Sequence, residues 1–519
     1  MTRLTEFTSY ADAQKHYSKE KLWELFDGDR AQFNIAHECL DRHVDGDNVA
    51  LRIAHSDGAD EVLTFEEVSR RSSQIAHYLD AKGIKKGDRV AVMIEPSLAF
   101  YSAMFGVIKS GAVAVPMFSL FGPDGIRLRV GDCKPAVFFT NSEKAPDALA
   151  GGAENVTVVD QDFLDGWNDF PASYDCATAG RDLAVLQYTS GTTRALPAAV
   201  KHSHQSIVTL MVAALYATGI RPGDRFFCPS SPAWGHGLWH GTLAPMAMGV
   251  STGTFSGKFD AVRLLRALHD FRITNLTAAA THYRMMRNSG EAENFTYSFD
   301  KLSFTGEPID SETASYVEQV FGTKVRSMYG TTEIGVIIAN YPGADDLEVR
   351  DGAMGKAVPG VEVEVQRPDG SAADPDETGE LMVKKRGQWF QTKDLGRVDA
   401  DGYFYHGGRA DDVIISAGWT IGAVEVEDAV LSHPTVSECA VIGAPDALRG
   451  LVVKAYIILK GDETPDLVQS IQDHVRSRLA RHEYPRQIEF VTDLPKTPAG
   501  KVNRKVLRDQ EAEKLAAAE

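Results

Sequence analysis

The first half of the chain alternates short apolar runs with amphipathic stretches, and this alternation limits the folds open to it. Apolar runs typical of β-strands span residues 90–94, 112–116, 136–140 and 156–160. Helical patterns precede and separate them, as at residues 99–109. Another helix is expected after Thr64, which can form a capping box with Glu67. Strands that alternate with helices indicate a mostly parallel, doubly wound sheet, so we predict an α/β fold.

The length and the second half of the sequence predict more than one unit. A chain of 519 residues exceeds what one hydrophobic core usually serves. From about residue 361, short strands and glycine turns indicate a β-rich subdomain. We expect a multi-layer N-terminal body over residues 1–408 and a small, mobile α+β domain over residues 409–519. In the latter, Thr464-Pro465 should open the last helix, and a charged, alanine-rich tail should follow from Glu511.

Composition and charge disfavour several classes of protein. Apolar residues make up 43% and charged residues 24%, as in ordinary globular chains. The formal charge of −18 disfavours nucleic acids and anionic membranes as partners. No apolar run approaches the roughly 20 residues that span a bilayer, and the first residues lack a signal-peptide core. Five scattered cysteines indicate a reducing compartment without disulfides or structural zinc, so we expect a cytoplasmic protein.

A loop of small hydroxyl residues follows the apolar run at residues 184–186. It reads Gln-Tyr-Thr-Ser-Gly-Thr-Thr over residues 187–193. Such a loop can bring backbone N–H groups and hydroxyls close to a polyphosphate, because no bulky side chain keeps the anion away. It is not a Walker A loop, since no Gly-Lys-Ser/Thr follows. Taken alone, it fits a Ser/Thr-rich surface loop better.

Further motifs follow this loop along the chain. They are Thr-Gly-Glu-Pro at 305–308, Tyr-Gly-Thr-Thr-Glu at 329–333, Thr-Lys-Asp-Leu-Gly at 392–396, Gly-Arg-Ala-Asp-Asp at 408–412 and Pro-Lys-Thr-Pro-Ala-Gly-Lys at 495–501. Each motif is weak alone. Together and in this order they resemble the adenylate-forming superfamily of acyl-CoA synthetases, peptide-synthetase adenylation domains and firefly-type luciferases. The resemblance covers residues 60–508 and is closest in kind to aryl- or medium-chain acyl-CoA ligases.

This resemblance implies an ATP site. The implied nucleotide-binding residues are Thr189, Ser190, Gly191, Thr192 and Thr193 around the phosphates, Gly306, Glu307 and Pro308 along the adenine, and Tyr329, Gly330, Thr331, Asp394 and Arg409. Tyr329 would lie against the adenine face, and Asp394 would accept hydrogen bonds from the ribose hydroxyls. Thr332 would contact the α-phosphate. Glu333 would hold Mg²⁺, a hard cation that bridges phosphates.

The resemblance also implies the catalytic groups. Joining a carboxylate to ATP brings two anions together, so the site must neutralise charge and align an in-line attack. Lys501 matches the mobile lysine that bridges the carboxylate and the α-phosphate. Asp411 matches the hinge about which the C-terminal domain swings before thioester formation. Gly418 would lie beside the tunnel that admits the pantetheine arm of coenzyme A.

The sequence departs from the family pattern at two places. Ala198 stands where the phosphate loop usually carries a lysine, and we hypothesise that Arg194 or Lys201 compensates. Thr420 stands where some short-chain synthetases carry an arginine, which puts that phosphate contact in doubt.

The acyl pocket implied by the resemblance combines aromatic and small side chains. Its expected lining is Trp234, Gly235, His236, Gly237 and Trp239, then Ala280 and Tyr283, then Gly330, Ile334 and Val336. Small residues beside aromatics favour a wide, flat slot for an aromatic or medium-length acid. Core packing is the alternative for the two tryptophans, and a structural role is the alternative for His236. Metal binding by the nearby histidines is disfavoured, because no carboxylate or thiolate cluster accompanies them.

We therefore expect a ligase that forms acyl-CoA, AMP and pyrophosphate from a carboxylic acid, ATP and coenzyme A, with Mg²⁺. Two alternatives stay open: an adenylation enzyme that loads a carrier protein, and a member of the fold that binds acyl or nucleotide ligands without catalysis. A luciferase-like oxidation has no supporting residue. The sequence leaves the acid and the oligomeric state open.

Overall fold

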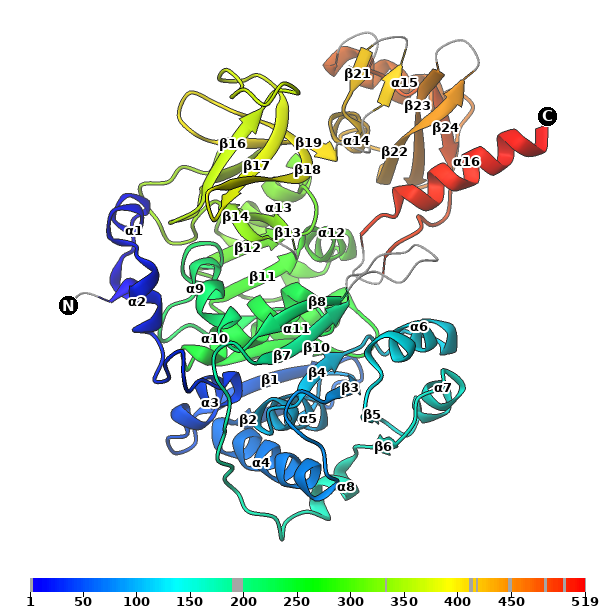
Figure 1. Cartoon of the computed structure of the whole chain (residues 1–519). Coiled ribbons are helices and arrows are strands. Elements are labelled where there is room, and N and C mark those ends of the chain that lie inside the picture. Colours follow the sequence, from blue (N-terminus) through cyan, green and yellow to red (C-terminus); the bar gives the residue numbers. More distant parts are fainter. Residues whose placement is uncertain are drawn as a thin grey trace.

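The computed structural model describes residues 3–188, 199–331, 334–409, 414–416, 419–446, 450–479, 483–497 and 501–518. Within these residues the strands form sheets of 13, six and five strands. The two larger sheets and their helices make up the body, and the smallest sheet lies in a separate C-terminal unit, drawn in orange and red (Figure 1).

The six-stranded sheet is the doubly wound sheet that the alternating pattern predicts. Its order is β6 (Val156–Val158), β5 (Val137–Thr140), β3 (Arg89–Met93), β4 (Val113–Pro116), β7 (Leu183–Tyr188) and β8 (Ala199–Ser203). All neighbours pair in parallel except β7 and β8. Helices α4 (Phe65–Ala81) and α5 (Leu98–Lys109) cover one face, and α6 (Pro123–Cys133) and α7 (Ala145–Ala150) the other. Successive side chains serve opposite faces, so Val90 and Val92 enter the first core, whereas Ala91 and Met93 enter the second.

Helix α4 begins where the sequence predicts. The hydroxyl of Thr64 accepts a hydrogen bond of 3.1 Å from the backbone N–H of Glu67, which satisfies one of the open donors of the first turn. Phe65, Val68 and Leu79 then form part of its buried face. The capping residue and the apolar spacing together set the position of this helix in the core.

The 13-stranded sheet joins a parallel part to an antiparallel part. Its order is β16 (Glu362–Gln366), β17 (Gly379–Lys385), β18 (Gln388–Val398), β19 (Phe404–Arg409), β15 (Ala353–Ala357), β14 (Gly335–Ala339), β13 (Val325–Thr331), β12 (Lys301–Thr305), β11 (Asn275–Ala279), β9 (Phe226–Phe227), β10 (Thr252–Ser256), β1 (Val49–His55) and β2 (Glu61–Thr64). The run from β13 to β1 is parallel. The run from β13 to β16 is antiparallel, so the predicted β-rich segment continues the edge of the large sheet.

Helices cover both faces of the large sheet. Helices α11 (Ala261–Asp270), α12 (Ala280–Ser289) and α13 (Ser311–Phe321) pack on one face, and α9 (Ser206–Tyr216) packs on the other. One buried cluster contains side chains of both large sheets and of α4, α5 and α9, so these helices join the two sheets. The shorter helices are η1 (Leu4–Glu6), α1 (Tyr10–His16), α2 (Lys19–Trp23), α3 (Ile35–Cys39), η2 (Asp41–His43), α8 (Gln161–Asp165), the π-helix η3 (His236–Leu243), α10 (Ala244–Ala247) and η4 (Ala292–Asn294).

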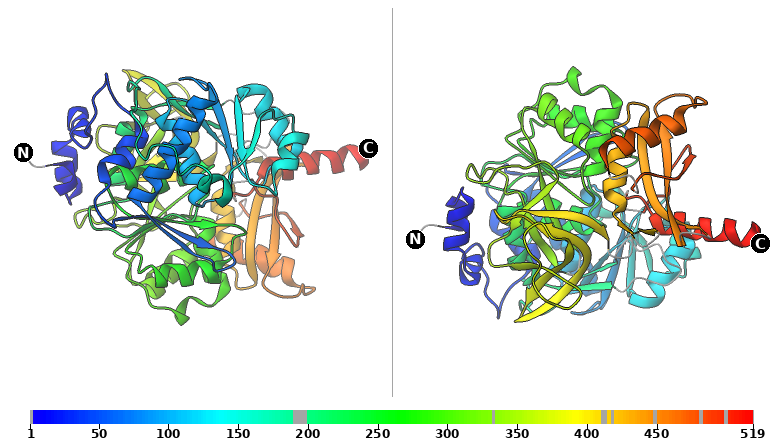
Figure 2. Two further views of the ribbon diagram at one scale, coloured as in Figure 1. Left: turned by 90° about the horizontal axis from the view of Figure 1, so that it is seen from below. Right: turned by 90° about the horizontal axis from the view of Figure 1, so that it is seen from above.

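The C-terminal unit has its own sheet and cores. Its strands are β21 (Trp419–Ile421), β20 (Ile414–Ser416), β23 (Gly450–Leu459) and β22 (Val436–Asp446), with β24 (Gln487–Phe490) paired to β23. Helices α14 (Ala423–Leu431) and α15 (Leu467–Arg478) pack on one face, and α16 (Arg504–Ala518) packs on the other through Leu507. Both views of Figure 2 show α16 projecting from the side of the molecule opposite the N-terminal helices.

The structure corrects two expectations for this unit. Helix α15 starts at Leu467, after Asp466, and not at Thr464-Pro465. The last helix is α16, which includes the supposed tail. Glu511 anchors it, because its carboxylate accepts a 2.6 Å hydrogen bond from the Tyr456 hydroxyl and lies 2.8 Å from the ammonium of Lys454.

Two further findings concern the state of the cysteine thiols and the length of the apolar helices. All five cysteines are described, and each has a free thiol. Among the described helices, none has an apolar stretch long enough to cross a bilayer.

Candidate active site

A cavity of about 1200 Å³ lies where the body meets the C-terminal unit. Its walls come from α9, the segment that leads into η3, the ends of β12 and β13, strand β14, and the segment before α16. The predicted site residues that line it are Trp234, Gly235, His236, Trp239, Gly306, Glu307, Pro308, Tyr329, Gly330, Thr331, Ile334, Val336, Asp394 and Lys501. With Gly408 of the Gly-Arg-Ala-Asp-Asp motif, the fold brings residues from five of the sequence motifs into one cavity.

Other predicted site residues lie outside the described part of the chain. They are Thr189, Ser190, Gly191, Thr192, Thr193, Arg194, Ala198, Thr332, Glu333, Asp411 and Gly418. Arg409 is described by its backbone, which ends β19 opposite Asp394 of β18. The predicted domain boundary at residues 408/409 thus falls within β19. The roles assigned to these residues stay predictions.

Lys501 reaches the cavity from the C-terminal unit. Its Nζ lies 5.6 Å from the centre of the Trp234 ring, and its Cε lies 3.3 Å from the point where a Cβ on Gly306 would stand. Two hydrogen bonds to Thr497 hold this lysine: its carbonyl accepts a 2.7 Å bond from the N–H of Thr497, and its own N–H donates to the Thr497 hydroxyl at 3.2 Å. These bonds fix the backbone of Lys501, while its ammonium lies at the junction of body and C-terminal unit.

Two glycines shape the cavity because no side chain fits at their positions. Gly306 has a φ of +101°, which L-residues rarely adopt, and lies against Lys501. A Cβ on Gly330 would lie 2.0 Å from the carbonyl oxygen of Gly335 on the neighbouring strand β14. Both positions therefore require glycine, and both keep the backbone open to a ligand.

Asp394 and Tyr329 form the polar side of the cavity. The Tyr329 hydroxyl donates a 2.5 Å hydrogen bond to Oδ2 of Asp394, and the N–H of Asp394 donates to the Thr392 hydroxyl at 3.1 Å. His406 adds a ring nitrogen 4.0 Å from Oδ1 of Asp394. The carboxylate is 5% exposed and its orientation is set by these neighbours. Such a preorganised acceptor suits a pair of vicinal hydroxyls, as in a ribose.

Glu307 is held by helix α12. Its Oε1 accepts hydrogen bonds from the Thr281 hydroxyl at 2.8 Å and from Arg284 at 3.2 Å. Arg284 also reaches Asp310, the residue that caps α13. Glu307 therefore connects the Gly-Glu-Pro turn to α12 and positions its backbone.

His236 is a buried histidine with partners at both ring nitrogens. Its Nδ1 lies 3.0 Å from the Ser230 hydroxyl, and its Nε2 lies 3.0 Å from the Thr277 hydroxyl. Burial is the main cause that holds the pKa of His236 well below its usual value, and electrostatic interactions with His240, His282 and Lys501 add to it. The ring is neutral at pH 7 and supports the cavity wall, which is the structural alternative left open by the sequence.

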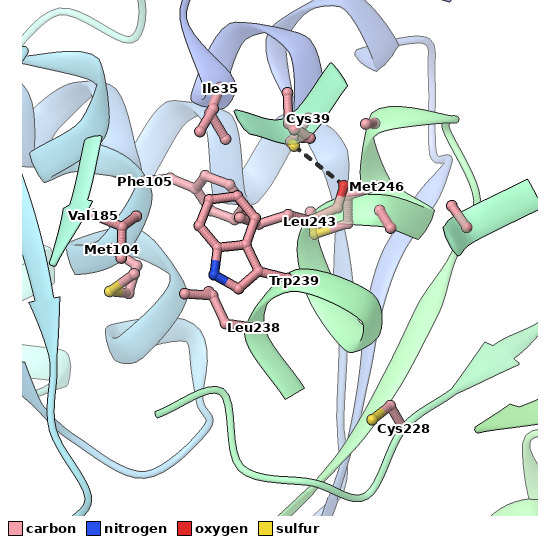
Figure 3. Packing of buried hydrophobic residues seen from close by; sticks show 14 of the residues in the cluster. Ile35, Cys39, Met104, Phe105, Val185, Cys228, Leu238, Trp239, Leu243 and Met246 are labelled. Atoms are coloured by element: carbon pink, nitrogen blue, oxygen red, sulfur yellow. Dashed lines mark hydrogen bonds between the residues drawn. The ribbon is translucent and has the colours of Figure 1, made fainter. Parts of the chain in front are cut away.

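The aromatic residues expected in the acyl pocket divide between core and cavity. Trp239 serves both: it is 6% exposed, donates its indole N–H to Gln187 at 3.0 Å and packs among Met104, Phe105 and Val185 (Figure 3), and it also lines the cavity. Tyr283 and Ala280 are fully buried and do not line the cavity. Tyr283 and Ala280 pack in the core, so their assignment to the acyl pocket was wrong. Trp234 is half-buried, lines the cavity and packs edge-on against His236 at 5.2 Å.

The sequence analysis did not assign His202 and His240 to the pocket, yet both line the cavity. His202 lies on β8, and its ring packs 4.5 Å from that of Trp239. His240 lies on η3, with its ring 6.0 Å from that of His236. Desolvation by burial lowers the pKa of each to about 4. Alternation along β8 and the helical position of His240 are signals that could have placed them.

Lys201 does not enter the cavity. It is exposed on β8, next to His202, and neighbouring side chains of a strand point to opposite faces. Because His202 faces the cavity, Lys201 faces away from it. Of the two cations proposed to replace the missing loop lysine, Arg194 is therefore the one that remains. Among the described residues no group of histidine, cysteine, aspartate and glutamate could hold a metal ion.

Comparisons with protein families show to which family this chain belongs. The family described as AMP-binding enzyme matches residues 41–390. The chain belongs to this family. The C-terminal domain of AMP-binding enzymes also matches residues 425–501, which end at Lys501.

Individual members of the AMP-binding enzyme family resemble the chain over nearly its full length. YtcI of Bacillus subtilis (strain 168), described as an uncharacterized acyl-CoA ligase, is 31% identical over 92% of this chain and 96% of its own. The mitochondrial acyl-coenzyme A synthetase ACSM3 of Rattus norvegicus is 30% identical over 97% of this chain and 94% of its own. The crystal structure of the anthranilate CoA ligase AuaEII with anthranoyl-AMP superposes with a TM-score of 0.85 at 28% identity, covering 94% and 99% of the two chains.

These similarities make the chain an AMP-forming acyl-CoA ligase with the adenylate-forming fold. Its substrates as a member of this class are a carboxylic acid, ATP and coenzyme A.

Proposed function

We propose that this ligase activates an aromatic or medium-length carboxylic acid as its acyl-adenylate and transfers the acyl group to coenzyme A. The position of Lys501 carries the proposal. Its side chain stands between Gly306 of the nucleotide side and Trp234 of the acyl side. An ammonium at this junction can contact a carboxylate and a phosphate at the same time.

The walls of the cavity support the choice of acid. Trp234 offers an aromatic face, and Gly235, Gly306 and Gly330 leave width beside it. A flat slot of this kind accommodates a ring better than a two-carbon acid, which would leave most of the apolar wall unfilled. The relative that binds anthranoyl-AMP, at 28% identity, points to the same class of acid.

In the proposed first half-reaction, a carboxylate oxygen attacks the α-phosphorus of ATP and the bond to pyrophosphate breaks. Lys501 offsets the negative charge that accumulates between the two anions. Asp394 accepts hydrogen bonds from the ribose hydroxyls and Tyr329 orients Asp394, so the α-phosphate is held in line for attack. Thr331 and Thr332 would contribute hydroxyl donors beside the phosphate.

In the proposed second half-reaction, the thiol of coenzyme A attacks the acyl carbon, and AMP leaves with its phosphate. The C-terminal unit would turn about Asp411 to withdraw Lys501 and open the tunnel beside Gly418. One ion pair across the junction, Lys460 to Glu312, spans 3.6 Å between partly exposed groups. Such a pair is weak, which suits a contact that has to break in each cycle.

Mg²⁺ is the expected companion of ATP, and its assignment rests on the sequence. Glu333 is the proposed ligand and supplies the oxygen donor that this ion prefers. Bound there, Mg²⁺ would neutralise the charge of the phosphates.

A panel of carboxylic acids tests the proposed function. Purified protein with ATP and Mg²⁺ should release pyrophosphate with aromatic or medium-length acids, and addition of coenzyme A should yield the thioester and AMP. Release of pyrophosphate with thioester formed only on a holo-carrier protein would identify the loading enzyme instead. No release with any acid would contradict the proposal and leave a ligand-binding protein.

A further inference from the structure

Two histidines in the cavity wall, His202 and His240, have a buried ring nitrogen without a hydrogen-bond partner among the described residues. These atoms are Nε2 of His202 and Nδ1 of His240. His236, on the same helix as His240, is bonded at both nitrogens. A buried polar atom without a partner costs free energy, so its presence in a cavity wall points to a ligand atom.

The two rings face the acyl part of the cavity. His202 packs against Trp239, and His240 lies on η3, which follows Trp234 along the chain; all four residues line the cavity. The nearby hydroxyl of Thr209 on α9 is already engaged, since it donates to the carbonyl of Ser206 at 2.9 Å. Among the described residues of this wall, the two imidazoles have buried nitrogens without a hydrogen-bond partner.

Neutral imidazoles select for neutral polar groups. Because burial lowers the pKa of both rings to about 4, each ring carries one N–H donor and one nitrogen acceptor at pH 7. A hydroxyl or amino group can donate to one ring and accept from the other. A second carboxylate would bring a charge into a partly buried wall, and neither neutral imidazole would offset it, which is costly.

We infer that His202 and His240 are specificity-determining residues that bind a hydroxyl or amino substituent on the acyl part of the acid. This inference rests on the proposed function and narrows its substrate class to monocarboxylic acids with a neutral polar group. An unsubstituted ring or chain would leave the imidazole nitrogens unpaired and would bind more weakly.

The test compares acids that differ in one substituent. Pyrophosphate release is measured with benzoate, its three hydroxy and three amino isomers, hexanoate, 6-hydroxyhexanoate, phthalate and adipate. At least one hydroxy or amino acid should have a kcat/KM about tenfold above its unsubstituted parent, mainly through KM. The two dicarboxylic acids should fall below their monocarboxylic parents.

Matched variants show whether the histidines cause the preference. His202→Leu and His240→Leu should each lower the ratio of substituted to parent acid towards one, whereas the similarly shaped His202→Asn and His240→Asn should retain part of it. His269→Gln is the control, because this partly exposed histidine lies on α11 outside the cavity. It should leave the ratio unchanged.

Two kinds of result would overturn the inference, one against the role of the histidines and one against the proposed function. Turnover without any preference for hydroxy or amino acids, or a preference that survives both leucine variants, refutes the role of the histidines alone. Absence of pyrophosphate with every acid refutes the proposed function and removes the basis of the inference with it.

Discussion

Replacement of Lys501 by methionine should separate the two half-reactions. Methionine keeps the length and apolar stem of the lysine against Trp234 and Gly306 but removes the charge. Adenylation, followed by pyrophosphate exchange into ATP, should fall steeply. Thioester formation from supplied acyl-adenylate and coenzyme A should stay close to that of the unmodified enzyme, because the proposed second step takes place after the lysine has left.

The size of the effect follows from the surroundings of the ammonium. Lys501 is partly buried, so an effective dielectric constant of about 20 is appropriate. At about 4 Å from one negative charge the interaction then amounts to about 4 kcal/mol. Each 1.4 kcal/mol corresponds to roughly a factor of ten in rate, so adenylation should fall about a thousandfold.

Lys496→Met provides the matched control for this experiment. Lys496 lies on the same segment, but its ammonium pairs with Glu438 at 3.0 Å and does not line the cavity. This variant should retain adenylation within a few-fold. Equal losses of both half-reactions in Lys501→Met, or no loss in either, would refute the reasoning.

Three further outcomes follow from the site. Asp394→Asn should raise the KM for ATP at least about tenfold, because hydrogen bonds to a charged group contribute roughly 1.5–3 kcal/mol; an unchanged KM contradicts the ribose contact. Gly306→Ala should slow adenylation more than Gly322→Ala does, since both backbones have positive φ but only the former would crowd the lysine; equal effects would indicate backbone strain alone. Acidification should destabilise the fold, because desolvation by burial lowers the pKa of His204 and of His282 from 6.5 to about 4. Their contribution is complete above pH 6.5 and is lost as pH falls towards 4, up to about 3 kcal/mol for each; urea unfolding that is equally stable at pH 7 and pH 4.5 would contradict it.

The regular elements were predictable because local patterns specify them. The apolar run at 90–94 became β3, and the helical spacing at 99–109 became α5, each displaced by one residue or less at its start. Thr64 capped α4 as expected, since the capping bond involves residues three apart. In these segments local propensity and tertiary burial agree, so the sequence alone was sufficient.

Other features depend on contacts between distant segments. Helix α16 had the composition of a solvated tail, and its docking depends on Glu511. Burial acts to raise the pKa of this carboxyl, but bonds from Lys454, Lys514 and Tyr456 outweigh it and lower the pKa to about 2. A local sequence pattern cannot predict hydrogen-bond partners that lie about 55 residues away along the chain, as Tyr456 does from Glu511.

The sequence motifs predicted which distant residues come together at the site. Motif residues as distant as Gly306, Asp394 and Lys501 line one cavity, although the roles assigned to them stay predictions. The wall of the acyl pocket was harder, because an apolar residue at the right position can belong to core or cavity. Tyr283 turned inward, and its hydroxyl donates to the carbonyl of Ser303 at 3.0 Å. His202 faces the cavity because alternate side chains of a strand point to opposite sides, and Lys201 takes the other side.

Because a π-helix spans His236–Leu243, deletion of one residue from this segment could change which acids the pocket prefers. A π-helix holds one residue more per closed ring than an α-helix does, as in the backbone bond from the N–H of Ala244 to the carbonyl of Trp239, five residues earlier. Deleting one residue would restore the tighter coil and rotate everything beyond the deletion by about 100°. If the deleted residue were Leu238, each later side chain would move back by one position and His240 would take the place of Trp239, so the loss of one codon could change the pocket where several point changes would be needed otherwise.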